Sequence, residues 1–373
     1  MSSVVTPTTS PRLPSLDAFR GVTVAAMVLV NNPGTWRAVY PPLRHAEWHG
    51  WTLTDTIFPA FLFVVGVAVP LAVGPRLERS GRAAVVIRVL RRSLVIFALG
   101  LVLNGFPDFP WATIRIPGVL QRIAVCYLVV ALLFVLTSRR TQALIAVALL
   151  VWYWALMTLV PIPGYGAGNL SPEGNLAAYV DRAVLGPHIW RAARVYDPEG
   201  ILSTVPAVVT TIAGVLAGAW LRAGRPPRVV VRGLALAGIV AAVLGELWGL
   251  WFPVNKSLWT SSYAVLMAGL SALGLAACYW AIEIAGHRRW AAPFRVFGVN
   301  ALALFFLSTL AARVLLLIRV GPERSSLQAV VFSHLFAPWA SPVNASLAYA
   351  VVYILVWWGL MWVLDRRGIY IRV

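Results

Sequence analysis

The sequence predicts an all-α membrane protein, a polytopic bundle of about ten transmembrane helices with both termini in the cytoplasm. Two features predict this fold class. Of the 373 residues, 60% are hydrophobic and 12% are charged, which is about half the charged fraction usual in soluble domains. The apolar residues fall into blocks of about 20, long enough to cross about 30 Å of hydrocarbon. We expect one transmembrane domain over residues 1–373, with a polar cytoplasmic tail at residues 1–14.

Ten apolar blocks are the candidate spans. The two longest connections, 161–200 and 319–346, are too short for a soluble domain and are expected to hold short helices. The candidate spans are residues 19–32, 53–73, 85–103, 118–136, 143–160, 202–221, 229–251, 259–284, 297–318 and 347–364.

The charge pattern predicts the orientation. Basic residues of membrane proteins gather in short cytoplasmic loops, and an inner N-terminus puts twenty of the 31 basic residues on the inner side. Most of the carboxylates then lie outside. This bias explains the net charge of +18, so the lipid bilayer is the expected partner and nucleic acid is not.

Cysteines and histidines give no sign of a metal site. Cys126 and Cys278 fall inside apolar blocks and are predicted to be core residues. No His or Cys cluster has metal-ligand spacing, so no metal is expected. Residues 1–14 are polar, so no cleaved signal peptide is expected, and the first span would act as the insertion signal.

A short polar loop between the first two spans carries the strongest candidates for chemistry. His45, Glu47, His49 and Asp55 lie within eleven residues of one another, on the predicted outer side. A neutral imidazole can act as a general base or can itself be acylated. A single histidine in such a loop is also consistent with an ordinary surface residue.

Two neighbours could assist His45. Asp55 lies near the start of the second span, where it could cap the helix or orient an imidazole, and the sequence leaves both roles open. Asn31 ends the first span, where it could donate to a developing oxyanion or cap the helix. We predict His45, Asn31 and Asp55 as the catalytic residues.

Other polar residues on the outer side predict one shared cavity. Arg122 lies about one turn into the membrane, which costs roughly 2.5–3.5 kcal/mol unless the charge is paired. Asp197 and Glu199 are its predicted partners, in a structural salt bridge or in a pocket for a polar substrate. The residues predicted to bind substrate are Arg115, Gln121, Arg122, Asp197, Glu199, Asn255, Lys256 and Trp259.

The predicted inner side is rich in arginine. Asp17 and Arg20 are spaced i, i+3 and can pair, although Arg20 could also contact phosphates. We predict a site for the phosphates of an anionic ligand at Arg20, Arg88 and Arg92. The arginines between residues 76 and 92 are also explained as a signal for membrane orientation and as lipid contacts. No Walker A or GxGxxG motif is present.

The stretches that contain these candidate residues resemble the transmembrane heparan-α-glucosaminide N-acetyltransferase family, in its compact bacterial form. The matching stretches run in family order over nearly the whole chain, and the one from His45 to Asp55 is the most specific. They are RLPSLDAFRG, VNNPG, LRHAEWHGWTLTDTIFPAFLFVVG, IRIPGVLQRIAVCY, YDPEGILSTVPA, NKSLWTSSY and FGVNALALFF.

The resemblance implies transfer of an acetyl group from cytosolic acetyl-CoA to a glucosamine amino group across a membrane. It places the catalytic histidine at His45 and the nearby asparagine at Asn31. Three departures stand out: no lumenal N-terminal domain is visible, a few extra residues separate Asn31 from His45, and His49 stands where lysosomal members are expected to have Asn. An Arg-rich chain is expected in a bacterial inner membrane, where heparan sulfate is not an expected acceptor.

The sequence therefore predicts a multi-pass N-acetyltransferase that uses acetyl-CoA and acetylates an amino sugar or glycan outside. The alternative is a polytopic transporter without chemistry, which ten spans with buried ionisable groups also fit. The sequence leaves open the acceptor, the choice between an acetyl-histidine intermediate and direct transfer, the place of the coenzyme A site, and the oligomeric state, a homodimer included.

Overall fold

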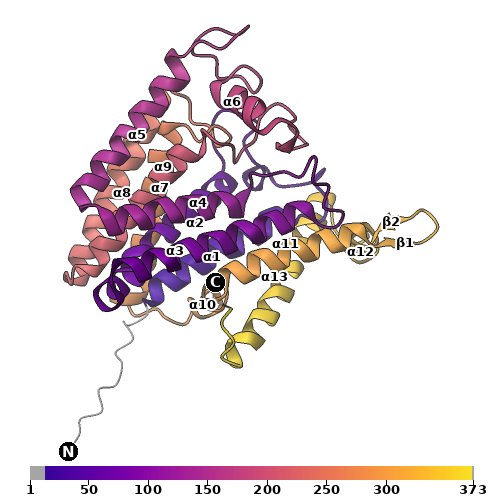
Figure 1. Cartoon of the computed structure of the whole chain (residues 1–373). Coiled ribbons are helices and arrows are strands. Elements are labelled where there is room, and N and C mark those ends of the chain that lie inside the picture. Colours follow the sequence, from indigo (N-terminus) through magenta and orange to yellow (C-terminus); the bar gives the residue numbers. More distant parts are fainter. Residues whose placement is uncertain (1–12, 372–373) are drawn as a thin grey trace, which may run out of the picture.

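Helices build almost the whole protein in the computed structural model, which describes residues 13–371 (Figure 1). Most of the predicted tail, residues 1–12, lies outside the described residues. The α-helices are α1 (Pro14–Asn31), α2 (Leu53–Ala72), α3 (Gly74–Gly105), α4 (Val119–Leu136), α5 (Arg139–Leu159), α6 (Leu176–Leu185), α7 (Thr204–Arg222), α8 (Pro227–Gly249), α9 (Ser261–Tyr279), α10 (Ala292–Val299), α11 (Ala301–Leu317), α12 (Leu327–Leu335) and α13 (Pro342–Arg366).

Short elements join these helices. They include a two-stranded antiparallel hairpin, which the sequence did not predict, formed by β1 (Arg319–Val320) and β2 (Ser325–Ser326). The two longest connections contain α6 and α12, so the expectation of short helices there is confirmed. The remaining elements are the 3₁₀ turns η1 (Pro41–Leu43) and η2 (Gly186–His188) and the π-helical turn η3 (Trp280–Ile284).

A helix lies at each of the ten predicted spans. Seven of the described helices are long and apolar enough to cross a membrane, and α10 with α11 makes eight if this pair, bent by 81°, is one span. The helices at the other two predicted spans, α1 and α3, are not apolar enough to meet the same criterion. Asp17 and Arg20 lower the hydropathy of α1, and arginines interrupt α3, whose backbone also breaks at Gly81. The protein is a polytopic helical membrane protein.

Helices α2 and α7 pack closely at the centre of the bundle. A Cβ on Gly66 would lie 2.0 Å from the carbonyl oxygen of Thr211, and one on Gly214 would lie 2.0 Å from that of Phe63. Small residues of this kind let membrane helices approach backbone to backbone. This contact sets how α2 packs on α7, and α9 packs on both helices.

The other helices flank this centre on two sides (Figure 1). Helices α5, α8 and α9 gather at one side, while α11, α12 and the β-hairpin extend to the other. Helix α1 packs on α2, α9, α10 and α13. Its end at Asn31 leads into the polar loop, and α10 packs near its start, where a Cβ on Gly298 would lie 2.0 Å from the carbonyl oxygen of Asp17.

Candidate active site

The loop between α1 and α2 carries His45 and ends at the helix turn that holds Asp55. Oδ2 of Asp55 accepts backbone hydrogen bonds from Thr52, the N-cap residue of α2, and from Ala46, each at 3.0 Å. Oδ1 of Asp55 lies 2.6 Å from Nδ1 of His45. One carboxylate oxygen therefore caps the helix and the other contacts the imidazole, so Asp55 has both of the contacts that the sequence left open.

This contact defines which ring nitrogen of His45 is available. An ionised carboxylate can only accept a hydrogen bond, so the hydrogen of a neutral ring lies on Nδ1 and the lone pair on Nε2. The side chain of Asp55 is 1% exposed, whereas that of His45 is 48% exposed. The arrangement gives an accessible imidazole held from behind by a buried carboxylate.

Lys256, the only lysine in the chain, completes a three-membered cluster. Its Nζ lies 2.9 Å from Nδ1 of His45 and 3.3 Å from Oδ1 of Asp55. One carboxylate thus faces two basic groups and can neutralise only one positive charge. Burial lowers the pKa of the Lys256 amine, and the nearby Asp55 charge offsets only part of this effect. The ammonium of Lys256 therefore gives up its proton more readily than that of a free lysine.

Two loops that are distant in sequence hold this cluster together. Gly50 N–H donates to the carbonyl of Val254 at 2.7 Å, and Nδ2 of Asn255 donates to the carbonyl of Trp48 at 2.8 Å. Oδ1 of Asn255 accepts from the backbone of Leu258 at 2.9 Å, and the residue is fully buried. Asn255 was predicted to bind substrate, but here it joins the two loops beneath the exposed surface.

A second charged cluster forms around Arg115. Its Nε donates to Oδ2 of Asp197 at 2.9 Å, and its Nη2 contacts both Asp197 and Glu199. Burial alone would lower the pKa of Arg115, but the two carboxylates outweigh it and raise that pKa. For Glu199 burial opposes ionisation, yet Arg115 and Arg122 lower its pKa. Arg115 is thus the direct partner of both carboxylates that were predicted to pair with Arg122.

Asp181 on α6 supports this second cluster, and the sequence analysis gave it no role in the site. Its Oδ1 accepts from the backbone of Ile201 at 2.9 Å and its Oδ2 from that of Asp197 at 3.4 Å. Burial raises the pKa of Asp181 to about 6. A carboxylate on the apolar face of a short amphipathic helix is the sequence signal that could have revealed this role.

Arg122 is buried directly behind the second cluster, one turn into α4 as predicted. Its Nη2 donates to the hydroxyl of Ser203 at 2.5 Å, and its guanidinium lies 5.0 Å from the ring centroid of Trp259. Nε and Nη1 of Arg122 have no hydrogen-bond partner. A buried guanidinium with two unpaired donors is costly and can hold an anionic or strongly polar group.

Trp259 and Gln121 occupy less exposed places than predicted. Trp259 is 1% exposed and lies behind Arg122, where its indole N–H donates to Thr210 at 3.2 Å. Gln121 faces α3, because a Cβ on Gly100 would lie 2.3 Å from its Oε1. Both side chains therefore back the site in this structure and do not open onto it.

The two charged clusters lie side by side. Glu199 acts electrostatically on Lys256, and the ring centroids of Trp48 and Tyr196 lie 5.0 Å apart. Tyr263 of α9 adds a further link, because its hydroxyl donates to the carbonyl of Asp55 at 2.6 Å. No role was predicted for Tyr263 from the sequence, although it is the last residue of the stretch NKSLWTSSY.

Asn31 is the exposed last residue of α1. The helix-end hydrogen bond that the sequence allowed for it is made by its neighbour, since Nδ2 of Asn32 donates to the carbonyl of Val28 at 2.7 Å. Asn31 therefore keeps its amide accessible at the same end of the bundle as His45.

His49 lies in the same loop as His45. Its Nδ1 is 3.5 Å from Nδ2 of Asn255, and burial lowers the pKa of His49.

The three arginines predicted to bind the donor lie on α1 and α3. Arg20 pairs with Asp17 at 3.2 Å, as its spacing predicted. Arg92 lies over the ring of Tyr127, 4.9 Å from its centroid, and Arg88 is exposed. Within residues 13–371, no group of three or more His, Cys, Asp or Glu side chains gathers as a metal site would.

Comparison with known proteins supplies a family. The family model described as heparan-alpha-glucosaminide N-acetyltransferase, catalytic, matches residues 12–242. The chain is 30% identical over 353 residues to the heparan-alpha-glucosaminide N-acetyltransferase of Homo sapiens, covering 79% of this chain and 52% of that protein. It is 28% identical over 351 residues to the Mus musculus protein, covering 79% and 53%. The chain thus spans about half the length of these curated relatives.

Proposed function

The chain belongs to the heparan-α-glucosaminide N-acetyltransferase catalytic family, and from this premise we propose that it transfers acetyl groups from acetyl-CoA to an amino sugar or glycan. The contact between His45 and Asp55 is the observation that carries the proposal. It presents an accessible Nε2 lone pair on a ring held by a buried carboxylate. Imidazoles held in this way serve acyl transfer in unrelated enzymes.

The transfer forms one bond and breaks another. The acceptor nitrogen, or Nε2 itself, attacks the thioester carbonyl, and the carbon–sulfur bond then breaks to release coenzyme A. In the direct route Nε2 takes the proton of the acceptor amine and passes it to the leaving thiolate. In the covalent route Nε2 carries the acetyl group before the amine receives it. Both routes use the same lone pair, and Asp55 stabilises the positive ring in each.

Lys256 and Asn31 would assist this chemistry. The Nζ of Lys256 lies 2.9 Å from Nδ1 and 3.5 Å from Nε2 of His45, close to the reacting ring. Burial lowers the pKa of Lys256, so in the covalent route its ammonium would give a proton to the leaving thiolate while Nε2 carries the acetyl group. The amide of Asn31, accessible at the end of α1, would donate to the oxyanion that forms at the acetyl carbonyl.

The second charged cluster would receive the acceptor. Arg115, Glu199 and Arg122 offer both donors and acceptors to a polar sugar, and the two unpaired donors of Arg122 can hold an anionic group. Asp197 would hold Arg115 in place. The buried side chains behind the site would hold it in place without contacting the acceptor. They are Trp259, Gln121 and Asn255.

The donor would approach from the opposite face of the membrane. Arg20, Arg88 and Arg92 lie towards the end of the bundle at which α1 begins and α2 ends, where a basic surface suits the phosphates of coenzyme A. Helix α2 has 20 residues, so about 30 Å separates its two ends. We place the His45 end outside and the N- and C-termini inside a bacterial inner membrane, from the arginine bias.

Purified protein incubated with radiolabelled acetyl-CoA and a panel of amino sugars tests this function. Transfer to an amino sugar that is lost in His45→Ala and retained in His287→Ala, a change of an exposed residue after η3 at the other end of the bundle, supports the proposal. Label on the protein that also depends on His45 indicates the covalent route. Full transfer in His45→Ala removes the proposed mechanism.

The transporter alternative makes a different prediction. It requires uptake of a solute into vesicles in the absence of acetyl-CoA. The family match favours acyl transfer, because the matching family is one of acetyltransferases. Uptake without acetyl-CoA, together with no transfer to any amino sugar, would favour transport.

A further inference from the structure

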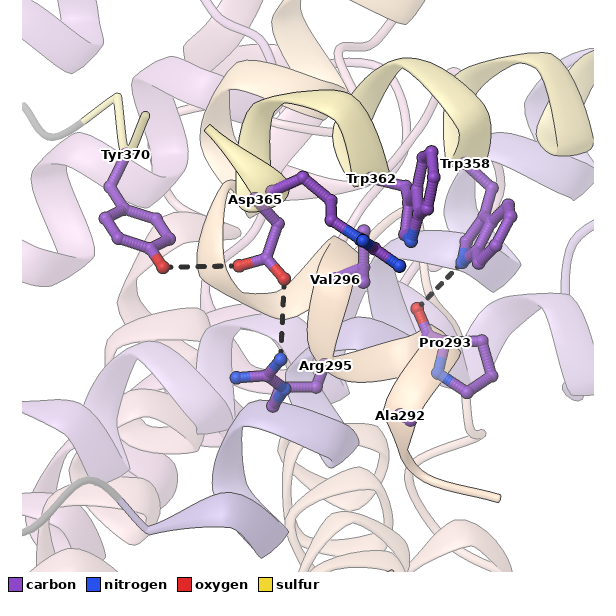
Figure 2. A pocket seen from close by; sticks show the side chains of 9 residues that line it. Ala292, Pro293, Arg295, Val296, Trp358, Trp362, Asp365 and Tyr370 are labelled. Atoms are coloured by element: carbon purple, nitrogen blue, oxygen red, sulfur yellow. Dashed lines mark hydrogen bonds and ion pairs between the residues drawn. The ribbon is translucent and has the colours of Figure 1, made fainter. Parts of the chain in front are cut away.

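A second site lies at the end of the bundle opposite His45. A cavity of about 480 Å³ opens between α10 and the last turns of α13 (Figure 2). Arg295 and Val296 from α10 form one wall, and Trp358, Trp362 and Arg366 from α13 form the other. Neither the catalytic mechanism nor the family match, which ends at residue 242, gives these residues a role.

The bundle places this cavity where a membrane span ends. Helix α13 is apolar enough to span and ends at Arg366, while α10 lies at 81° to α11 and so runs across the end of the bundle. The opposite end of α13 meets the polar loop, since Gly34 N–H donates to the carbonyl of Ser346 at 3.1 Å. The 18 residues of α1 separate the two ends by about 27 Å.

The cavity combines positive charge with aromatic rings. Arg295 pairs with Asp365 at 3.4 Å, and Tyr370 donates to the same carboxylate at 3.3 Å. The guanidinium of Arg366 lies 4.7 Å from the ring centroid of Trp362 and forms no ion pair with a described carboxylate. The described lining thus contains two guanidiniums and one carboxylate, and this net positive charge suits an anion.

The neighbouring face of α13 is built for lipid. Trp358 and Trp362 stack at 23°, and the indole N–H of Trp358 donates to the carbonyl of Pro293 at 3.3 Å. Tryptophans at the end of a span are typical of the membrane interface. Exposed apolar residues continue from there along α13, at Val352, Leu355, Val356, Leu360 and Val363.

We propose that this cavity binds the phosphate headgroup of an anionic phospholipid. Arg366 and Arg295 hold the phosphate, and the acyl chains follow the apolar face of α13. A phospholipid fits the cavity better than a nucleotide does, because its acyl chains also account for the exposed apolar face of α13 that continues from the two stacked tryptophans. The proposal does not depend on acetyl transfer.

Native mass spectrometry of the full delipidated chain measures this binding. One phosphatidylglycerol is expected to stay bound under conditions that remove phosphatidylcholine with the same acyl chains. The double change Arg295→Gln with Arg366→Gln should weaken phosphatidylglycerol binding by about thirtyfold, from about fivefold for each interfacial arginine. The matched control, Arg288→Gln with Arg289→Gln, removes the same charge from the preceding exposed loop and should leave binding unchanged.

Three results would overturn the proposal. Equal loss in both double variants would mean that surface charge alone attracts the lipid. Equal retention of phosphatidylcholine would remove the preference for an anionic headgroup. Displacement of phosphatidylglycerol by equimolar coenzyme A would assign the cavity to a nucleotide. If the glutamine pair does not fold, Arg295→Lys with Arg366→Lys keeps the charge: retained selectivity supports the site, and lost selectivity contradicts it.

Discussion

Nδ1 of His45 lies 2.6 Å from Oδ1 of Asp55, a carboxylate whose other oxygen caps the helix on which it sits. The residue that orients the imidazole is therefore itself fixed by the backbone of Thr52 and Ala46. Such support gives an active-site group a single orientation before substrate binds.

Asp55→Asn should abolish most activity while the protein still folds. An amide keeps an oxygen for the backbone N–H groups of Thr52 and Ala46, but it turns an N–H group towards His45 and forces the wrong tautomer. A loss of about 10²- to 10⁴-fold in kcat is expected. Thr56→Ala is the control, because it removes a hydroxyl of the same helix turn, one that donates to the carbonyl of Leu53. A kcat for Asp55→Asn within threefold of wild type would contradict the proposed role.

Lys256 should react with an amine-selective reagent at a lower pH than a free lysine does. It is the only lysine, so peptide mapping separates its product from that of the N-terminal amine. Burial lowers the pKa of Lys256, and the Asp55 charge raises it. Asp55→Asn should therefore move the midpoint of labelling to still lower pH. A midpoint that moves upward would show that Asp55 does not act on this amine.

Arg122→Met should lower activity without lowering stability. The change removes a buried guanidinium with two unpaired donors, and with it the cost of taking that charge and those donors out of water. Acetyl transfer should fall by about 10²-fold, since an oriented donor is lost. Ser203→Ala removes only the hydroxyl partner and serves as the comparison. A large fall in the melting temperature of Arg122→Met would show that the charge is structural.

Asp181→Asn should flatten part of the dependence of stability on pH. The pKa of Asp181 is raised to about 6, above its ordinary value of 3.8, so the folded state binds this proton more tightly than the unfolded state does. The stability that the proton contributes is fully present below pH 3.8 and is lost as the pH rises to about 6. The difference between the two pKa values corresponds to roughly 3 kcal/mol.

Thermal unfolding in detergent between pH 4 and 7 checks this prediction. The melting temperature of wild type minus that of Asp181→Asn should fall as the pH rises. Glu173→Gln, a change of an exposed carboxylate, should show a constant difference from wild type. A constant difference for Asp181→Asn as well would mean that Asp181 does not titrate in this range.

The sequence by itself determined the helices, their apolar lengths and the short loop that brings His45 close to Asp55. These features depend on residues near each other in the chain, which composition and spacing reveal directly. It also predicted Asp197 and Glu199 as partners for a buried arginine, because costly charges near a membrane need partners. It assigned them to Arg122, whereas the structure pairs both carboxylates with Arg115.

Only the tertiary structure decided what surrounds these residues. It put Lys256 beside His45 across a sequence separation of 211 residues, and it turned Trp259 and Asn255 into buried supports. The physical reason is that such contacts depend on how α2 packs against α7 and α9. That packing depends on close glycine contacts such as those of Gly66 and Gly214, which leave no periodic signal in the sequence.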